Sequence, residues 1–225
     1  MTATGKPVIG VIGGTGHLGG ALAGRWCQAG YRVVIGSRDA ERARAAAAAH
    51  APANGGAVSG ASNREAAREA TVVVVAVPFA SQEATLAEIR DEVAGKLVVD
   101  TTVPLVPPKV MRVQLPPEGS AAVRAQALLG EAATVVSAFH NVAAHRLATG
   151  EPVDCDVLVF GEKREARERV VELAHAVGLR GLHAGSLANS AAAEALTSIL
   201  IFINKHYSAD GAGLRITGDL KSGAG

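Results

Sequence analysis

The chain has 225 residues, enough for one sizeable core with at most a small appendage. Its hydrophobic fraction of 48% indicates a packed domain and argues against disorder, and its formal net charge of +1 gives no support to nucleic-acid or acidic-membrane binding. Residues 1–7 hold one lysine and no apolar stretch, and the apolar run 199–203 is too short to span a bilayer. We therefore expect a cytoplasmic protein without a membrane partner.

Short runs of β-branched residues alternate with Ala-rich stretches along the first hundred residues. This pattern predicts strands at 7–12, 32–36, 57–60, 71–77 and 96–101, and helices at 18–29, 40–50, 63–70 and 81–93. The run 71–77 holds five valines and should be a central, buried strand. Such alternation predicts right-handed crossovers and a Rossmann-type, doubly wound α/β fold with a mostly parallel sheet.

The second half of the chain begins with residues 103–117, which hold five of the nine prolines and should form an extended excursion. We expect the sheet to resume with strands at 134–139, 156–160 and 179–183, with a charged helix at 163–177. The final helix, 187–206, is apolar around most of its circumference and needs cover from the sheet, a partner subunit or both. We expect a homodimer, with residues 1–185 as the nucleotide-binding domain and 186–225 as a helical segment packed on it in one structural unit.

A glycine-rich segment directly after the first predicted strand matches the pattern G-x-G-x-x-G. It consists of Gly14, Thr15, Gly16, His17, Leu18 and Gly19. In this position the first glycine permits a tight turn, the second lets a pyrophosphate approach the backbone, and the third lets helix and strand pack closely. A purely structural glycine turn is the alternative. Because strand, spacing and helix are all present, we predict a dinucleotide site.

The end of the second predicted strand indicates which dinucleotide is bound. A site for NAD usually has a carboxylate there that accepts hydrogen bonds from the ribose 2′-hydroxyl. This chain instead has Ser37 and Arg38, with Arg42 one helical turn later on the same side. Guanidinium groups suit phosphate oxygens, so the segment favours NADP(H). Asp39 is interpreted as the N-cap of the second helix, and a surface ion pair between Asp39 and Arg42 is the alternative.

The two cysteines, Cys27 and Cys155, lie far apart among apolar or small neighbours. Their positions fit no metal-ligand spacing, and the histidines have no partners at such spacing. We interpret both cysteines as buried free thiols and expect no metal site.

Several motifs together resemble one known family, the F420-dependent NADP reductases, over nearly the whole chain. The motifs are G-G-T-G-H-L-G at 13–19, I-G-S-R at 35–38, V-P-F at 77–79, S-A-F-H at 137–140 and N-S-x-x-x-E-x-L-T at 189–197. Enzymes of this family pass a hydride between NADP(H) and the deazaflavin coenzyme F420. The resemblance therefore implies an NADP-dependent oxidoreductase with F420 as its second substrate.

The resemblance also implies roles for individual residues. Thr15, Ser37, Arg38 and Arg42 would hold the adenine-side phosphates, and Val77, Pro78 and Phe79 would run beside the nicotinamide arm. His140, Asn141 and Val142 would lie where the nicotinamide and deazaflavin rings meet. Ser190 and Thr197 would face the deazaflavin side from the last helix.

Two questions stay open at this stage. His140 is suited either to donate a proton or simply to orient its loop through a hydrogen bond. The second substrate could be an imine, a keto acid or a metal chelate in place of F420, and a non-catalytic NADP-sensing protein is a further alternative. Only about forty residues follow the last predicted strand, too few for the large helical domain of related dehydrogenases. A second substrate must therefore bind largely against the Rossmann domain, which suits a flat aromatic cofactor.

Overall fold

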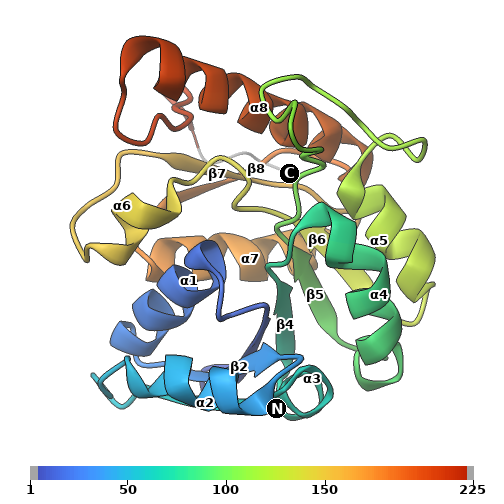
Figure 1. The fold of residues 1–225 in the computed structure, drawn as a ribbon, viewed down its shortest axis with the longest axis vertical. Helices are drawn as coiled ribbons and strands as arrows, with labels where there is room; N and C mark the ends of the chain where they lie inside the picture. Colours follow the sequence, from blue (N-terminus) through green and yellow to red (C-terminus); the bar gives the residue numbers. More distant parts are fainter. Residues whose placement is uncertain (1–4, 222–225) are drawn as a thin grey trace.

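The computed structural model describes residues 5–221, and its largest element is a six-stranded sheet with the strand order β3-β2-β1-β4-β5-β6 (Figure 1). All neighbouring strands in it run parallel. The strands are β1 (Ile9–Ile12), β2 (Arg32–Ser37), β3 (Ala57–Ser62), β4 (Val72–Val75), β5 (Leu97–Asp100) and β6 (Thr134–Ser137). This is the doubly wound Rossmann order, so the predicted fold class is confirmed.

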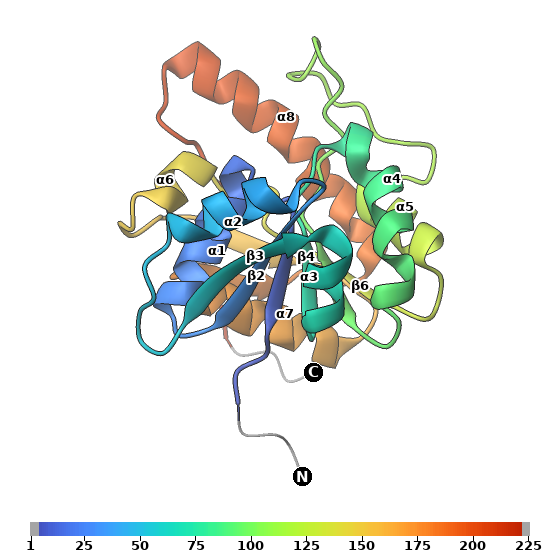
Figure 2. The ribbon, with the colours of Figure 1, turned by 60° about the horizontal axis from the view of Figure 1, so that its bottom comes forward.

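Helices cover both faces of this sheet, as Figure 2 shows. The first core contains side chains of α1 (His17–Gln28), α2 (Ala40–Ala48) and α7 (Arg164–Ala176), and the second contains those of α3 (Asn63–Glu69), α4 (Phe79–Ile89) and α5 (Ala121–Leu129). Successive residues of a strand point to opposite faces. In β4, accordingly, Val72 and Val74 enter the first core while Val73 and Val75 enter the second. Burial on both sides explains the unbroken run of valines.

The last two strands do not extend the six-stranded sheet in parallel, and the expectation that this sheet resumes is wrong for them. β7 (Asp156–Val159) and β8 (Arg180–His183) form a separate parallel pair. One antiparallel bridge, Ser137 to Phe160, connects this pair to β6, with N–H···O distances of 2.8 and 2.9 Å. After β6 the chain continues into α6 (Ala144–Ala148), which packs on α1 and does not cross back over the sheet. The chain therefore meets the end of β6 again in the antiparallel direction.

Residues 103–117 contain no helix or strand, as predicted, whereas the helices α5 and α6 were not expected. Both cysteines are buried and free, which confirms their interpretation. The C-terminal helix α8 (Ser190–Tyr207) follows a 3-10 turn at Leu187–Asn189. By length and composition alone, the stretch Leu187–Tyr207 would suffice to cross a membrane, and 33% of an apolar 18-residue window within it is buried in the structure.

Burial along α8 is unusual for a helix of this composition. Its core-facing positions include the polar residues Ser190, Glu194 and Ser198, which are at most 3% exposed. The large apolar residues Ile199 and Phe202 are 46% and 50% exposed. Polar contacts therefore help to attach this helix to the rest of the chain, beside the burial of Ala193 and Leu200.

Candidate functional site

The turn after β1 is shaped by a glycine that lies outside the predicted G-x-G-x-x-G segment. Gly13 has a φ of +81°, and a Cβ at this position would lie 2.5 Å from the carbonyl oxygen of Ala76. Its N–H donates to the carbonyl of Gly36 at 3.0 Å. The left-handed conformation and the close approach both require glycine here. The tight turn that sequence reasoning assigned to Gly14 therefore depends on Gly13.

The other two glycines lie where helix α1 meets this turn. Gly16 precedes the helix, and no side chain caps the first turn. A Cβ on Gly19 would lie 2.7 Å from the carbonyl oxygen of Gly13, so the predicted close packing of helix and strand is present. The first N–H groups of a helix have no partner within it, and their positive end attracts anions. The turn is therefore built to receive a phosphate.

The segment after β2 presents two guanidinium groups. Asp39 accepts hydrogen bonds from the N–H groups of Glu41 (2.9 Å) and Arg42 (3.2 Å), which confirms it as the N-cap of α2. Within residues 5–221, neither Arg38 nor Arg42 takes part in an ion pair. The alternative of an Asp39–Arg42 surface pair is therefore not found. Both arginines are available to an anionic ligand.

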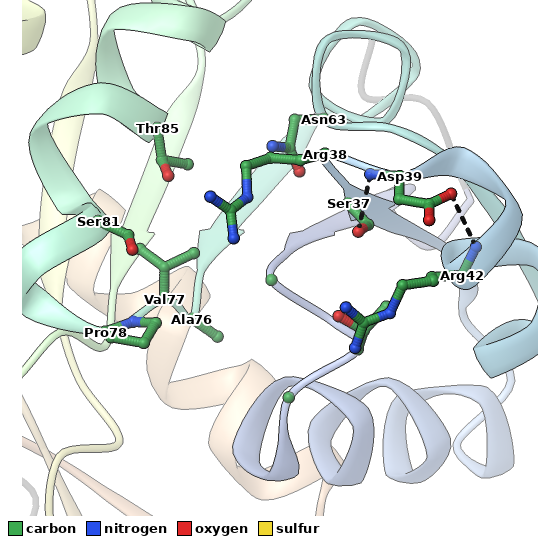
Figure 3. Close-up of a pocket in the computed structure, with 13 residues that line it drawn as sticks. Ser37, Arg38, Asp39, Arg42, Asn63, Ala76, Val77, Pro78, Ser81 and Thr85 are labelled. Carbon is green, nitrogen blue, oxygen red and sulfur yellow. Dashed lines mark hydrogen bonds between the residues drawn. The ribbon is translucent and has the colours of Figure 1, made fainter.

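These segments enclose a cavity of about 370 Å³ (Figure 3). Its lining includes seven of the predicted site residues, namely Thr15, Gly16, Ser37, Arg38, Arg42, Val77 and Pro78. Figure 3 shows Arg38 extending from the end of β2 toward the side formed by Val77, Ser81 and Thr85. The cavity thus joins the glycine-rich turn, the end of β2 and the loop after β4, which is the crevice where doubly wound folds bind nucleotides.

Six lining residues were not predicted, and they are Gly13, Asp39, Asn63, Ala76, Ser81 and Thr85. Ser81 and Thr85 lie one turn apart on α4, so their helical spacing could have identified them. Asn63 is 3% exposed and donates from Nδ2 to the carboxylate of Glu88 at 2.9 Å. A carboxylate only accepts, so the amide orientation is fixed and leaves the buried Oδ1 without a partner.

The remaining predicted residues do not line this cavity. Gly14 and Gly19 are buried beneath it, His17 and Leu18 lie in the first turn of α1, and Phe79 begins α4. His140, Asn141 and Val142 follow β6 and are 7–9% exposed. Ser190 and Thr197 belong to α8. The structure therefore separates the predicted residues into a nucleotide cavity and a second group around β6 and α8.

The segment after β6 holds a buried histidine in a constrained backbone. Phe139 has a φ of +67°, is 1% exposed and packs edge-on against Trp26, with ring centroids 5.9 Å apart. A left-handed conformation at an aromatic residue stores strain of order 1–3 kcal/mol, and such strain occurs preferentially at functional sites. His140 Nε2 lies 2.7 Å from Ser137 Oγ. Burial lowers the pKa of His140 to about 4, so its imidazole is neutral at pH 7.

Helix α8 is joined to this segment by side-chain contacts. Asn141 Nδ2 donates to the carbonyl of Ala193 (2.9 Å) and to Thr197 Oγ1 (3.1 Å). Thr197 Oγ1 lies 3.1 Å from the carbonyl oxygen of His140, to which it can donate. The predicted residues His140, Asn141 and Thr197 are therefore in contact with one another. Ser190 lies apart from them, fully buried, with its hydroxyl 2.9 Å from Ser120 Oγ and 3.1 Å from Glu194 Oε1.

Two carboxyl groups, that of Glu194 on α8 and that of Asp100 at the end of β5, are also buried. Burial raises the pKa of Glu194 to about 7, although the N–H groups of Ala121 and Ala122 donate to it and oppose the shift. Burial also raises the pKa of Asp100, whose carboxylate accepts from Gln82 Nε2 at 2.6 Å. Sequence reasoning named neither residue as part of the site.

Comparisons of sequence and of structure with known proteins both find F420-dependent NADP reductases. A family model described as "NADP oxidoreductase coenzyme F420-dependent" matches residues 8–104. The F420-dependent NADP reductase of Methanothermobacter thermautotrophicus is 44% identical over 93% of this chain and 94% of its own. A structure from Arthrobacter sp. FB24, assigned to the F420-dependent NADP reductases, has a TM-score of 0.79 and 26% identity over 95% of this chain and 100% of its own. The rat metalloreductase STEAP3 is 32% identical over 84% of this chain and 36% of its own.

The position of Arg38 predicts that it distinguishes NADPH from NADH. Arg38→Ala should weaken NADPH binding at least about tenfold, because charge-assisted hydrogen bonds to the 2′-phosphate are lost, and should change NADH binding little. Titration of each nucleotide by calorimetry measures this. Arg44→Ala is the matched control, since Arg44 lies six residues further along the chain on α2, pairs with Glu41 and does not line the cavity. Equal losses for both nucleotides would show that Arg38 does not bind the phosphate.

The buried imidazole of His140 predicts a specific loss of stability in acid. Its folded-state pKa of about 4 lies below the ordinary 6.5, so in this window the unfolded chain binds more protons and stability falls as the pH falls. Between pH 7 and pH 5 the wild type should lose about 2 kcal/mol more than His140→Gln in the free energy of unfolding. Urea titrations at both pH values measure the difference. Glu194 titrates in both proteins and cancels, so parallel losses would refute the buried, neutral histidine.

Proposed function

This chain belongs to the family of F420-dependent NADP reductases, and we propose that it transfers a hydride between NADP(H) and the deazaflavin coenzyme F420. The observation that carries the proposal is the extent of the resemblance, which includes the nucleotide-binding strands and the C-terminal helix together. The free guanidinium groups of Arg38 and Arg42 in the cavity support the choice of NADP over NAD.

The proposed reaction makes limited demands on the protein. A hydride moves from the nicotinamide ring to a carbon of the deazaflavin, NADPH is oxidised, and the reduced deazaflavin takes up one proton from solvent. Neither a metal nor a nucleophilic side chain is needed. The chain has to hold the two rings at roughly 3–3.5 Å and exclude water.

We assign the predicted residues to these tasks in two groups. Thr15, Ser37, Arg38 and Arg42 hold the phosphates on the adenine side. Val77, Pro78 and Phe79 flank the nicotinamide arm, His140, Asn141 and Val142 lie where the rings meet, and Ser190 and Thr197 serve the deazaflavin side from α8. Because the pKa of His140 is about 4, its neutral ring suits a positioning role better than proton donation at pH 7.

Mixing the protein with NADPH and oxidised F420 tests the proposal. Absorbance of the oxidised deazaflavin should fall as NADPH is consumed in equal amount, and Arg38→Ala should need much more NADPH for the same rate. Persistent deazaflavin absorbance across a range of pH, with NADPH binding intact, would refute F420 as the substrate.

A metal chelate is the second candidate substrate, because the resemblance to rat metalloreductase STEAP3 covers 84% of this chain. The same NADPH oxidation assay with a ferric chelate in place of F420 separates the two. NADPH oxidation with the ferric chelate but not with F420 would favour the chelate as the substrate. NADPH oxidation with F420 but not with the chelate would exclude it.

We infer further that the protein is a cytoplasmic homodimer joined through the exposed face of α8. Ser198 Oγ lies 3.4 Å from the carbonyl oxygen of Arg112, so the proline-rich excursion lies against this helix. Large apolar side chains from both segments are 39–50% exposed, namely Val106, Met111, Val113, Leu115, Ile199 and Phe202. We infer that these side chains together form an apolar face of the kind that marks an interface.

Phe202→Glu should dissociate this dimer, because two buried carboxylates would face each other without partners. Sedimentation velocity at micromolar concentration should give a dimer for the wild type and a monomer for the variant. Leu220→Glu is the control, since Leu220 is equally exposed at 51% but lies outside this face. A wild-type monomer, or a dimeric Phe202→Glu protein, would exclude this interface.

A further inference from the structure

The core-facing side of α8 carries a carboxylate where an apolar residue would be expected. Glu194 is 1% exposed, whereas Phe202, two turns further on the same helix, is half exposed. A largely apolar helix normally buries its apolar stripe. Removing a carboxylate from water is costly unless strong hydrogen bonds replace the lost solvation. The contacts of Glu194 therefore indicate what the carboxylate stabilises.

Glu194 binds the N-terminus of α5. Its Oε2 accepts from the N–H of Ala121 at 2.6 Å and its Oε1 from the N–H of Ala122 at 3.2 Å. The N-cap, Ser120, accepts from the next N–H, that of Val123, at 3.0 Å. One side chain from α8 thus serves the two N–H groups that the cap leaves without partners, at the positive end of the helix.

The N-terminus of α5 is itself fixed to the sheet. Gln82 on α4 is fully buried, and its Nε2 donates both to Asp100 at the end of β5 (2.6 Å) and to the carbonyl of Ala121 (3.0 Å). Through Ala121, the carboxylate of Glu194 is connected to the carboxyl edge of the sheet. The anchoring point of α8 is therefore rigid.

Thr197 lies three residues beyond Glu194, so the two side chains lie on adjacent positions of one helix face. Thr197 contacts the side chain of Asn141 and the carbonyl oxygen of His140. Within the described part of the chain, Thr197 provides the side-chain hydrogen bonds from α8 to this segment, and the backbone carbonyl of Ala193 accepts a further one from Asn141. A shift of α8 along or about its axis would therefore move the backbone of the segment after β6.

We propose that Glu194 is a positioning residue for hydride transfer: by binding the N-terminus of α5 it sets the position of Thr197, which holds His140 and Asn141 beside the reacting rings. This inference rests on the proposed function for the role of residues 140–142. Glu194 itself touches neither ring, and it acts through the helix that carries it.

Glu194→Gln tests the proposal, because the amide keeps the shape but can accept from only one of the two N–H groups. We expect kcat/KM for F420 to fall about tenfold, since small misplacements of reacting groups are costly, while the Kd for NADPH stays within about twofold. Glu165→Gln is the matched control: it makes the same substitution in the exposed first turn of α7. Unchanged kcat/KM in folded Glu194→Gln protein would overturn the proposal.

A double-mutant cycle tests whether Glu194 acts through Thr197. Thr197→Val alone should lower kcat/KM for F420 by a similar factor, and the double variant should lose little more than either single variant. Independent effects would multiply to about a hundredfold loss and would overturn the proposed route. Rates measured well below the melting temperature of every variant exclude unfolding as the cause.

Hydrogen exchange separates this inference from the proposed function. In the NADP-bound protein, the peptide covering residues 137–143 should exchange faster in Glu194→Gln than in wild type or Glu165→Gln. Unchanged exchange would overturn the positioning role whatever the activity. Faster exchange in a protein that fails to reduce F420 would support the positioning of the segment and refute only the substrate.

Discussion

Parallel pairing of β1 with β2 and β4 is the constraint from which the nucleotide cavity follows. Ile12 lies opposite Gly36 on one side and Val75 on the other, so all three strands end at the same edge. The chain leaves β1 for one side of the sheet and returns through β4 on the other, which opens a crevice at this switch point. A register slip of one residue would exchange the side chains of β4 between the two cores and would shift the turn at Gly13 relative to Arg38.

Sequence reasoning predicted this half of the molecule well because its signals are local. The alternation of strands and helices, the close packing at Gly19 and the N-cap role of Asp39 each depend on residues within about one turn or strand. Gly13 was given no role of its own because the G-x-G-x-x-G pattern begins at Gly14. Asn63 was missed because its place in the cavity depends on how α3 meets β2, which no local pattern shows.

The second half was harder to predict because its contacts are distant in sequence. The return of the chain over α1 decides that β7 joins β6 antiparallel, and a strand pattern does not specify direction. Helix α8 was correctly located as a helix that needs cover, but its apolar composition concealed that Ser190, Glu194 and Ser198 face inward. Their partners, Ser120, Ala121 and the backbone of Arg112, lie seventy or more residues earlier. The proposed dimer would cover the large apolar side chains that α8 leaves exposed.

Deuterium transfer tests the central claim, direct hydride transfer between NADP(H) and F420, most directly. NADPH deuterated at the transferring carbon of the nicotinamide would be mixed with F420 and the enzyme in ordinary water, and the reduced F420 would be analysed by mass spectrometry. We expect the deuterium in the reduced coenzyme, because rings held in contact exchange the hydride without solvent. Reduced F420 that contains only solvent hydrogen at the reduced carbon would contradict direct transfer.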